Sequence, residues 1–180
     1  MTEYGNQINI SEPIKMTESE KDFVKSFDCG NESINEYLKE KSFSDPQTVT
    51  FIFKDIEKNK VICYYSLSCS GLVANHNYGN KISIYPAVEI KMFATDEQYQ
   101  HIPYSDNNDD GVLSDMLLAE VIYNIYKFTD NQCGADKIVL YAVPDFVNFY
   151  SRNGFCEFKE FMIPSTNWYI DGCIPMYMDL

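Results

Sequence analysis

One tyrosine in this sequence lies where a phenol could donate a proton. Tyr150 follows Phe146 and Phe149 at the spacing of one helix face, shortly after an apolar run that ends at Val143. A phenol held in a ligand site can protonate a leaving group. The alternative is a core tyrosine with a satisfied hydroxyl, and the pattern alone favours it because the chain contains 14 tyrosines.

The segment around Tyr150 predicts a strand, a short helix and a second strand. Asp136–Val143 is apolar and rich in β-branched residues, as is typical of a buried parallel strand. Pro144 suits the first turn of a helix, and Gly154 can adopt the left-handed conformation that ends it. Phe155 then begins the second strand. Tyr150 would lie near the C-terminal end of the first strand, where ligands gather in open α/β sheets.

Helices and strands are expected along the rest of the chain. Residues 1–20 are polar and predict an opening strand or arm, and Asn31 or Ser33 can cap a helix that runs to about Lys41. Further strands are expected at Thr48–Phe53, Val61–Ser70, Tyr85–Thr95 and Met176–Asp179, with a turn at residues 76–80. A long helix at Val112–Thr129 should bury the stripe Leu113, Leu117, Val121, Ile125 and Phe128. This order predicts an α/β fold with a mixed central sheet, helices on both faces and a single domain over residues 1–180.

Composition and charge restrict the class of protein. Hydrophobic residues make up 45% of the chain and aromatic residues 15%, which suits a globular core. No apolar run reaches the length of a membrane span, so no membrane partner is expected. Six cysteines without a C-x-x-C pair argue against zinc and for reduced core thiols, which predicts a cytoplasmic protein. A net charge of −13 argues against a nucleic acid partner.

Residues 149–155 read F-Y-S-R-N-G-F and resemble the F-Y-x-[KR]-x-G-F signature of the GNAT-superfamily acetyltransferases. The order of expected elements is similar to that family from about Phe27 to Leu180. The resemblance implies a GNAT-like fold, acetyl-CoA as the acetyl donor, and a small-molecule or peptide amine as the acceptor. It also implies that Tyr150 protonates the departing CoA thiolate.

The resemblance also points to a base on the strand expected at Tyr85–Thr95. Within that strand Val88, Ile90 and Met92 alternate with Glu89, Lys91 and Phe93, so Glu89 lies on the more polar face. Many GNAT enzymes use a glutamate on this strand to take a proton from the amine, directly or through water. The alternative, favoured by the pattern, is a solvated strand residue.

The resemblance implies that the backbone at the end of the same strand pairs with the pantetheine arm of the cofactor. By position these groups belong to Phe93, Ala94 and Thr95. Because the interaction needs only unpaired backbone N–H and C=O groups, it constrains the side chains weakly. The alternative is an ordinary central strand.

The pyrophosphate loop of the family has the pattern [QR]-x-x-G-x-[GA] and opens a long helix. Gln100 matches its first position. Counted back from the helix, the two glycine positions fall on Val112 and Ser114, on either side of Leu113. Backbone N–H groups at this helix N-terminus would hold the phosphates. Gly111, one residue away, can take over the permissive role of the missing glycines.

The loop departs from the family pattern in length and in charge. It is longer, and four aspartates crowd it: Asp106, Asp109, Asp110 and Asp115. Carboxylates there can stabilise the helix N-terminus, and they can also repel a pyrophosphate. Both interpretations stay open. Arg152 could meet a CoA phosphate or lie in solvent.

A second resemblance lies near the N-terminus. Phe27-Asp28-Cys29-Gly30-Asn31, followed by Ile34, Tyr37 and Leu38, is similar to the opening of GNAT toxins of bacterial toxin–antitoxin pairs. It implies aminoacyl-tRNA as substrate and a small antitoxin-like protein partner. The net charge opposes this, although Lys21, Lys25, Lys39 and Lys41 cluster around the first helix.

Together these features favour an N-acetyltransferase that moves an acetyl group from acetyl-CoA to a primary amine. Two alternatives remain. One is a non-catalytic GNAT-fold interaction module with a degenerate phosphate loop, and the other is a toxin-type enzyme that acts on aminoacyl-tRNA.

Overall fold

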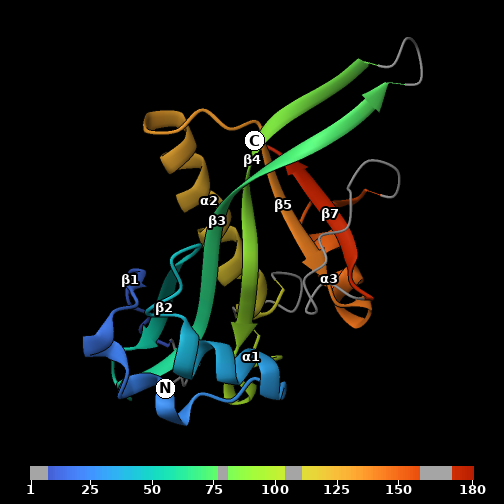
Figure 1. The fold of residues 1–180 in the computed structure, drawn as a ribbon. Coiled ribbons are helices and arrows are strands. Elements are labelled where there is room, and N and C mark those ends of the chain that lie inside the picture. Colours follow the sequence, from blue (N-terminus) through green and yellow to red (C-terminus); the bar gives the residue numbers. More distant parts are fainter. Residues whose placement is uncertain (1–7, 77–80, 104–110, 159–171) are drawn as a thin grey trace. The chain divides into compact units, whose positions relative to one another are not determined.

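The computed structural model describes residues 8–76, 81–103, 111–158 and 172–180 (Figure 1). The turn expected at residues 77–80 and three of the loop aspartates, Asp106, Asp109 and Asp110, lie outside these residues. The contacts of the chain divide it into two compact units. The first comprises Met1–Leu67 and Met92–Glu120, and the second comprises Ser68–Lys91 and Val121–Leu180.

The described part of the chain forms one mixed sheet of seven strands in the order β1-β2-β3-β4-β5-β7-β6. Strands β4 and β5 pair in parallel, whereas the pairs β1–β2, β2–β3, β5–β7 and β6–β7 are antiparallel. The strands are β1 (Ile14–Lys15), β2 (Val49–Asp55), β3 (Lys60–His76), β4 (Lys81–Thr95), β5 (Lys137–Ala142), β6 (Cys156–Glu157) and β7 (Ile174–Asp179). The expectation of a mixed α/β sheet is therefore confirmed.

The helices of the described residues are mostly short, with one long exception. That exception is α2 (Leu113–Asn131). The others are η1 (Glu18–Glu20), η2 (Phe23–Ser26), α1 (Glu32–Glu36), η3 (Tyr37–Lys41), η4 (Glu97–Tyr99), η5 (Pro144–Phe146) and α3 (Val147–Arg152). Asn31 caps α1 as expected, because its side chain accepts a hydrogen bond from Ile34 N at 3.2 Å.

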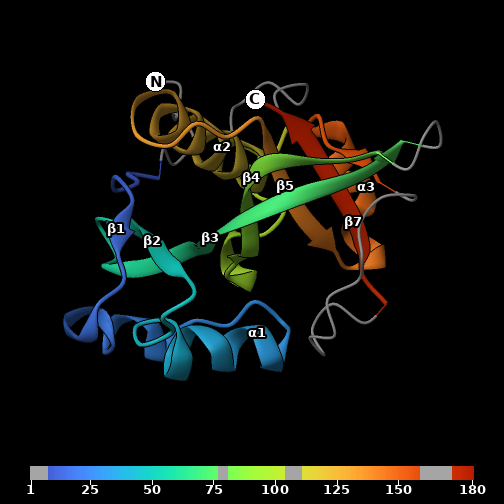
Figure 2. The same ribbon diagram turned by 45° about the horizontal axis from the view of Figure 1, so that its top comes forward.

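Helix α1 and its continuation η3 pack on the first strands within the first unit. Figure 2 shows α1 running along one side of β1 and β2. Leu38 from η3 is buried in a cluster with Ile52 of β2 and Tyr64 of β3. The Tyr64 hydroxyl donates to the Ile34 carbonyl at 2.9 Å, so the phenol that anchors this helix is satisfied.

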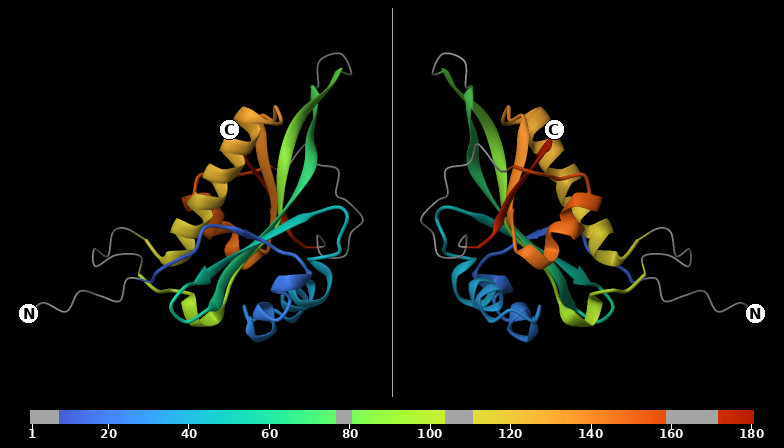
Figure 3. Two further views of the ribbon diagram at one scale, coloured as in Figure 1. Left: turned by 90° about the vertical axis from the view of Figure 1, so that its left-hand side faces the viewer. Right: turned by 90° about the vertical axis from the view of Figure 1, so that its right-hand side faces the viewer.

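The core of the second unit surrounds the parallel pair β4–β5. Val88 and Ile90 lie opposite Ile138 and Leu140, and all four side chains are buried. Both views of Figure 3 show the second half of α2 running beside β5. Strand β7 then inserts between β5 and β6, with Val139 opposite Tyr177.

Several boundaries and burial expectations are corrected by the structure. Strands β3 and β4 are longer than expected, and β6 has only two residues. Phe128 is 40% exposed, and Thr129 takes its place on the buried stripe of α2 because it follows Ile125 by four residues. Of the six cysteines, only Cys63 is buried, so the expectation that most are core thiols is wrong.

Across the described residues, no helix combines the length and the apolar character that crossing a membrane requires.

Candidate functional site

The end of β4 extends beyond its ladder with β5. The pairs of this ladder run from Ala87–Lys137 to Ile90–Leu140, whereas β4 itself continues to Thr95. Phe93 is half-buried, and Ala94 and Thr95 are buried. The expected pairing with a pantetheine arm uses backbone groups. It therefore requires a strand end that continues beyond its pairing with the neighbouring strand, as the end of β4 does beyond β5.

Gln100, predicted to begin the phosphate loop, uses its side-chain amide inside the protein. Its Nε2 donates to the Thr95 carbonyl at 2.8 Å and to the Cys29 carbonyl at 3.2 Å. The side chain therefore ties the end of β4 to the segment that precedes α1. This contact gives Gln100 a structural role, and it engages one carbonyl, that of Thr95, in the stretch predicted to pair with a cofactor.

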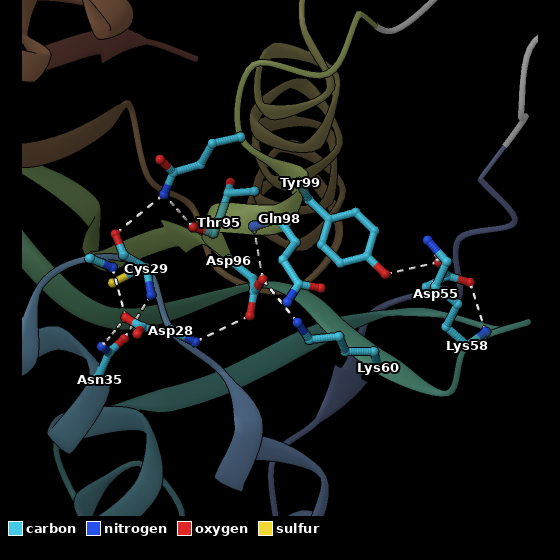
Figure 4. A network of polar contacts seen from close by, with 12 residues as sticks. Asp28, Cys29, Asn35, Asp55, Lys58, Lys60, Thr95, Asp96, Gln98 and Tyr99 are labelled. Carbon is cyan, nitrogen blue, oxygen red and sulfur yellow. Dashed lines mark hydrogen bonds and ion pairs between the residues drawn. The ribbon is translucent and has the colours of Figure 1, made fainter.

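Asp96 holds the same junction together from the residue after β4. It is 2% exposed, and its carboxylate accepts hydrogen bonds from Asp28 N (3.1 Å), Gln98 N (3.1 Å) and Lys60 Nζ (3.1 Å). Figure 4 shows these groups converging on Asp96. Charge-assisted bonds of this kind are stronger than neutral ones, so the network fixes the position of the β4 end.

A second buried pair adjoins this junction. The Tyr99 hydroxyl donates to the Asp55 carboxylate at 2.9 Å (Figure 4). Asp55 also accepts from Glu57 N and Lys58 N. Burial and the adjacent carboxylate raise the pKa of Tyr99 well above its usual range. Burial alone would raise the pKa of Asp55, but the hydrogen bonds outweigh it and the pKa lies below the ordinary value.

The turn before α2 has the backbone that a permissive glycine provides. Gly111 has a φ of +82°, and a Cβ there would lie 3.1 Å from Oδ2 of Asp115. The same Oδ2 accepts a hydrogen bond from Val112 N at 3.0 Å. This is one half of a capping box, in which the third helical residue reaches back to the N-cap N–H. Asp115 therefore stabilises the helix start.

The first two residues of α2, Leu113 and Ser114, also form hydrogen bonds. Leu113 N donates to the Ile102 carbonyl at 2.8 Å, and the hydroxyl of Ser114 donates to Oγ1 of Thr95 at 3.2 Å. Ser114 thus fastens the start of α2 to the end of β4. The structure places the predicted residues Thr95, Gln100 and Ser114 in one hydrogen-bonded group.

Tyr150 lies in the second unit, on α3, as expected. Its half-buried ring meets Phe149 and Phe155 edge to face, with centroids 5.1 and 5.8 Å apart. The Tyr150 carbonyl accepts from Asn153 N and Phe155 N, both at 3.1 Å. Packing on two sides and the hydrogen bonds of the turn restrict the directions in which the phenol can point.

The turn after α3 confirms the glycine expectation. Gly154 has a φ of +92°, and a Cβ there would lie 3.0 Å from Cε of Met178. Arg152 is exposed, and its guanidinium lies 5.1 Å from the centroid of the Phe149 ring. This cation–π contact gives Arg152 a partner on its own helix.

Glu89 is buried, at 8% exposure, and the interpretation of a solvated strand residue is wrong. Burial raises the pKa of its carboxyl, while Lys91 and a hydrogen bond from Ser70 act in the opposite direction. Burial of this kind is one way in which proteins tune a carboxyl for proton exchange. The alternation of β4 could not reveal the burial, because neighbouring strands produce it.

Sequence reasoning did not single out Asp96, Lys60, Tyr99 or Asp55. An Asp directly after a strand and two residues before Gln98 is an N-cap signal that could have identified Asp96. Its ion pair with Lys60 joins residues 36 positions apart and has no local signature.

No family model and no curated protein matches the sequence. Solved structures do match. A bacterial toxin superposes with a TM-score of 0.69 at 17% identity, over 95% of this chain and 90% of that one. A Tyr-to-Phe mutant of the protein KacT gives 0.69 at 17%, over 97% and 95%. The protein AtaT, complexed with acetyl-methionyl-tRNAfMet, gives 0.69 at 16%, over 95% of both chains.

These likenesses extend over nearly the whole chain. At identities below one fifth they establish the fold. The chain therefore has a GNAT-like fold, similar to that of the KacT and AtaT structures.

Proposed function

We propose that this protein is an N-acetyltransferase that moves an acetyl group from acetyl-CoA to a primary amine. The observation that carries the proposal is the F-Y-S-R-N-G-F segment. It folds as the second half of α3 and the turn that leads to β6, with Gly154 left-handed, in a chain whose fold matches that of a structure of AtaTR bound with acetyl-CoA (TM-score 0.62). Signature and fold therefore support the same activity independently.

Acetyl-CoA, when bound, supplies the acetyl group as a thioester. The backbone of Phe93–Thr95 and the start of α2 at Val112–Ser114 are the groups that would hold it. The first follows the end of the β4–β5 ladder, and the second follows the left-handed Gly111. In this proposal Tyr150 gives its proton to the leaving sulfur, and Glu89 takes a proton from the amine, directly or through water.

The toxin-type alternative is favoured by one observation, the complex of AtaT with acetyl-methionyl-tRNAfMet. The lysines near the first helix oppose it. Lys25 pairs with Asp22 at 2.6 Å, and Lys41 pairs with Glu36 at 3.2 Å. Lys21 lies 3.9 Å from Glu18. Acidic partners thus lie beside three of the four lysines near the first helix. A net charge of −13 also disfavours binding of RNA. We therefore assign a small-molecule or peptide amine.

An antitoxin-like protein is the partner that this alternative would add, because AtaT has been solved with the C-terminus of the antitoxin AtaR. All six cysteines are free thiols, which fits the cytoplasmic setting of the proposal.

A non-catalytic module is the third candidate. The observation in its favour is that Val112 N and Leu113 N, both predicted to face phosphates, already have partners in Asp115 and Ile102. Binding of acetyl-CoA would have to break at least the first of these hydrogen bonds.

The test has two stages. Calorimetry with acetyl-CoA should show binding, and thiol release should then be followed with methionyl-tRNA, a lysine-containing peptide and spermidine as acceptors. Transfer to the peptide or to spermidine supports the proposal, whereas transfer to methionyl-tRNA alone supports the toxin. Absence of acetyl-CoA binding would overturn both and leave the interaction module.

A further inference from the structure

The second half of β3 has an open edge. The ladder between β2 and β3 ends at the pair Val49–Leu67, whereas β3 itself continues to His76. In the strand order β3 lies between β2 and β4, so in the described part of the chain the strand that pairs with β3 beyond Leu67 is β4. The backbone N–H and C=O groups of Ser68–His76 that point away from β4 are therefore available to another strand.

The neighbouring half of β4 has an open edge as well. Strand β4 begins at Lys81, whereas its ladder with β5 begins at Ala87. In this region, which belongs to the second unit, the sheet is a two-stranded ribbon, and Figure 1 shows β3 and β4 running side by side there. A two-stranded ribbon is marginally stable in water, and a third strand stabilises it. The ribbon would therefore be stabilised by a further strand on one of its edges.

The two edges differ in how they are protected against pairing. Natural proteins block open edges with lysine, with other charged side chains or with proline. The β4 edge carries two such residues, Lys81 and Pro86. The β3 edge reads S-C-S-G-L-V-A-N-H and contains no lysine, arginine, aspartate, glutamate or proline. The edge that is open to pairing is therefore that of β3.

The outer side of the β3 edge allows another strand to approach closely. Cys69 and Gly71 are exposed, and neither has a bulky or charged side chain, whereas Leu72 packs into the core on the other side. A Cβ at Gly71 would lie 3.5 Å from Cγ2 of Ile84, and Ile84 is 70% exposed. Gly71 thus leaves apolar surface uncovered beside the edge. A glycine inside a strand often marks the close approach of another backbone.

Charge and symmetry identify the kind of partner that fits this edge. Between Ser66 and Val88 the one charged residue is Lys81, in a chain in which 23% of the residues are charged. The β3 edge has no carboxylate to attract a basic partner and no lysine to attract an acidic one. Two copies with a net charge of −13 repel each other, so an uncharged edge is where they can meet at least cost. A strand that pairs antiparallel with itself also has the twofold symmetry of a homodimer.

We propose that Ser68–His76 pairs antiparallel with the same segment of a second copy, so that the sheets of the two copies join into one. The register follows from the two ends of the edge. On one side β2 occupies the edge up to Leu67, and on the other side the strand ends at His76. The pairing that uses the whole edge is centred midway between residues 68 and 76. Leu72 then lies opposite Leu72 of the second copy.

The first experiment measures the oligomeric state of the full chain by analytical ultracentrifugation at low and high salt. A dimer is expected, and it should become tighter at high salt, because salt screens the repulsion between two copies of charge −13. A dimer that weakens at high salt would depend on ion pairs and would overturn the proposal. A monomer at every concentration would also overturn it, and would leave the edge to an extended segment of another protein.

The second experiment adds the protection that the β3 edge lacks. Gly71→Lys puts a charge on the outer side of the edge, where the neighbouring atoms leave room for a Cβ. The dissociation constant of the dimer should rise about 10-fold or more, because the charge enters the joined sheet twice. Gly134→Lys is the matched control, since Gly134 is exposed and no atom lies within 4 Å of its added Cβ. Equal dissociation constants for the two variants would overturn the proposal.

The third experiment tests the register and leaves the edge uncharged. In the centred pairing Cys69 lies opposite residue 75 of the second copy, and opposite residues of an antiparallel pair are close enough for a disulfide. Mild oxidation of Asn75→Cys should therefore give a covalent dimer on a non-reducing gel, and adding Cys69→Ala should abolish it. Ala74→Cys is one residue out of register and is the control. No cross-link in Asn75→Cys, or equal cross-linking in Ala74→Cys, would refute the pairing.

Discussion

The Asp115 carboxylate accepts a hydrogen bond from Val112 N, at 3.0 Å. The contact places a negative charge at the helix start where a pyrophosphate is expected to bind. It is favourable for the helix, because it satisfies one of the N–H groups that every helix start leaves unpaired. The same contact would compete with a phosphate, so helix stability and cofactor affinity should respond to Asp115 in opposite directions.

We expect Asp115→Asn to tighten acetyl-CoA binding. The amide oxygen can still accept from Val112 N, while the charge that repels phosphates is removed. A charge at a helix terminus typically contributes 0.3–1 kcal/mol, so affinity should rise about 2- to 5-fold. Calorimetry at low and high salt checks this, and the gain should shrink at high salt.

The matched control is Asp130→Asn, at the far end of the same helix. Asp115→Ala should lower the melting temperature as well, because the cap is lost. Equal affinities for wild type and Asp115→Asn would show that the phosphates bind away from this turn.

Tyr150→Phe should remove one hydroxyl and keep the packing against Phe149 and Phe155. If the phenol protonates the leaving thiolate, kcat should fall about 10²–10⁴-fold, since that is the usual contribution of a general acid. Affinity for acetyl-CoA should change much less. Steady-state kinetics beside a melting curve measure both effects.

The control for this variant is Tyr126→Phe, on the exposed side of α2. A folded Tyr150→Phe protein with wild-type kcat would remove Tyr150 from the mechanism.

Asp96→Ala should be strongly destabilising. It would leave the ammonium of Lys60, whose side chain is 18% exposed, without its carboxylate partner. Breaking a buried pair on one side costs about 3–5 kcal/mol. Urea unfolding measures the free energy. Asp96→Asn should lose less, because an amide oxygen can still accept from Asp28 N.

Asp22→Ala breaks the exposed pair with Lys25 and serves as the control. Exposed pairs contribute little, so it should show no measurable change. A similar loss in both variants would argue against a special role for the Asp96 junction.

Glu89 should make stability depend on pH. Burial raises the pKa of its carboxyl in the folded state above the unfolded value, so stability is fully present below the unfolded pKa. It is then lost as the pH rises through the folded pKa. Glu89→Gln cannot ionise, and its stability relative to wild type should therefore increase from pH 4 to pH 8.

Urea unfolding at several pH values checks this, with the exposed Glu57→Gln as the matched variant. A difference between Glu89→Gln and wild type that does not vary with pH would mean that Glu89 ionises as freely as in the unfolded chain.

Local signals in the sequence predicted the elements around Tyr150 well. Pro144 begins η5 and Gly154 is left-handed, because both depend on backbone restrictions of single residues. The start of α1 at Asn31 follows from the same kind of signal. The strand order required a resemblance to a known fold, since pairing partners are distant in sequence.

Side-chain environments were predicted less well, for a physical reason. Glu89 is buried by strands on both sides of β4, and no period within β4 encodes that. Tyr99 had no signal in the sequence, yet it is buried and its hydroxyl donates to Asp55, 44 residues away. Phe128 lies at the edge of the helix stripe, where a shift of one residue exchanges it with Thr129.

The insertion of β7 between β5 and β6 has a consequence for folding of the chain during its synthesis on the ribosome. Strand β6, which directly follows the helix of Tyr150, pairs with β7, and β7 is translated later. Until Ile174–Asp179 have been synthesised, β5 and β6 of the nascent chain have no β7 to pair with, and these are the strands on either side of the Tyr150 helix. The segment that carries the proposed acid therefore reaches its final setting late in synthesis, after the first unit has had time to fold.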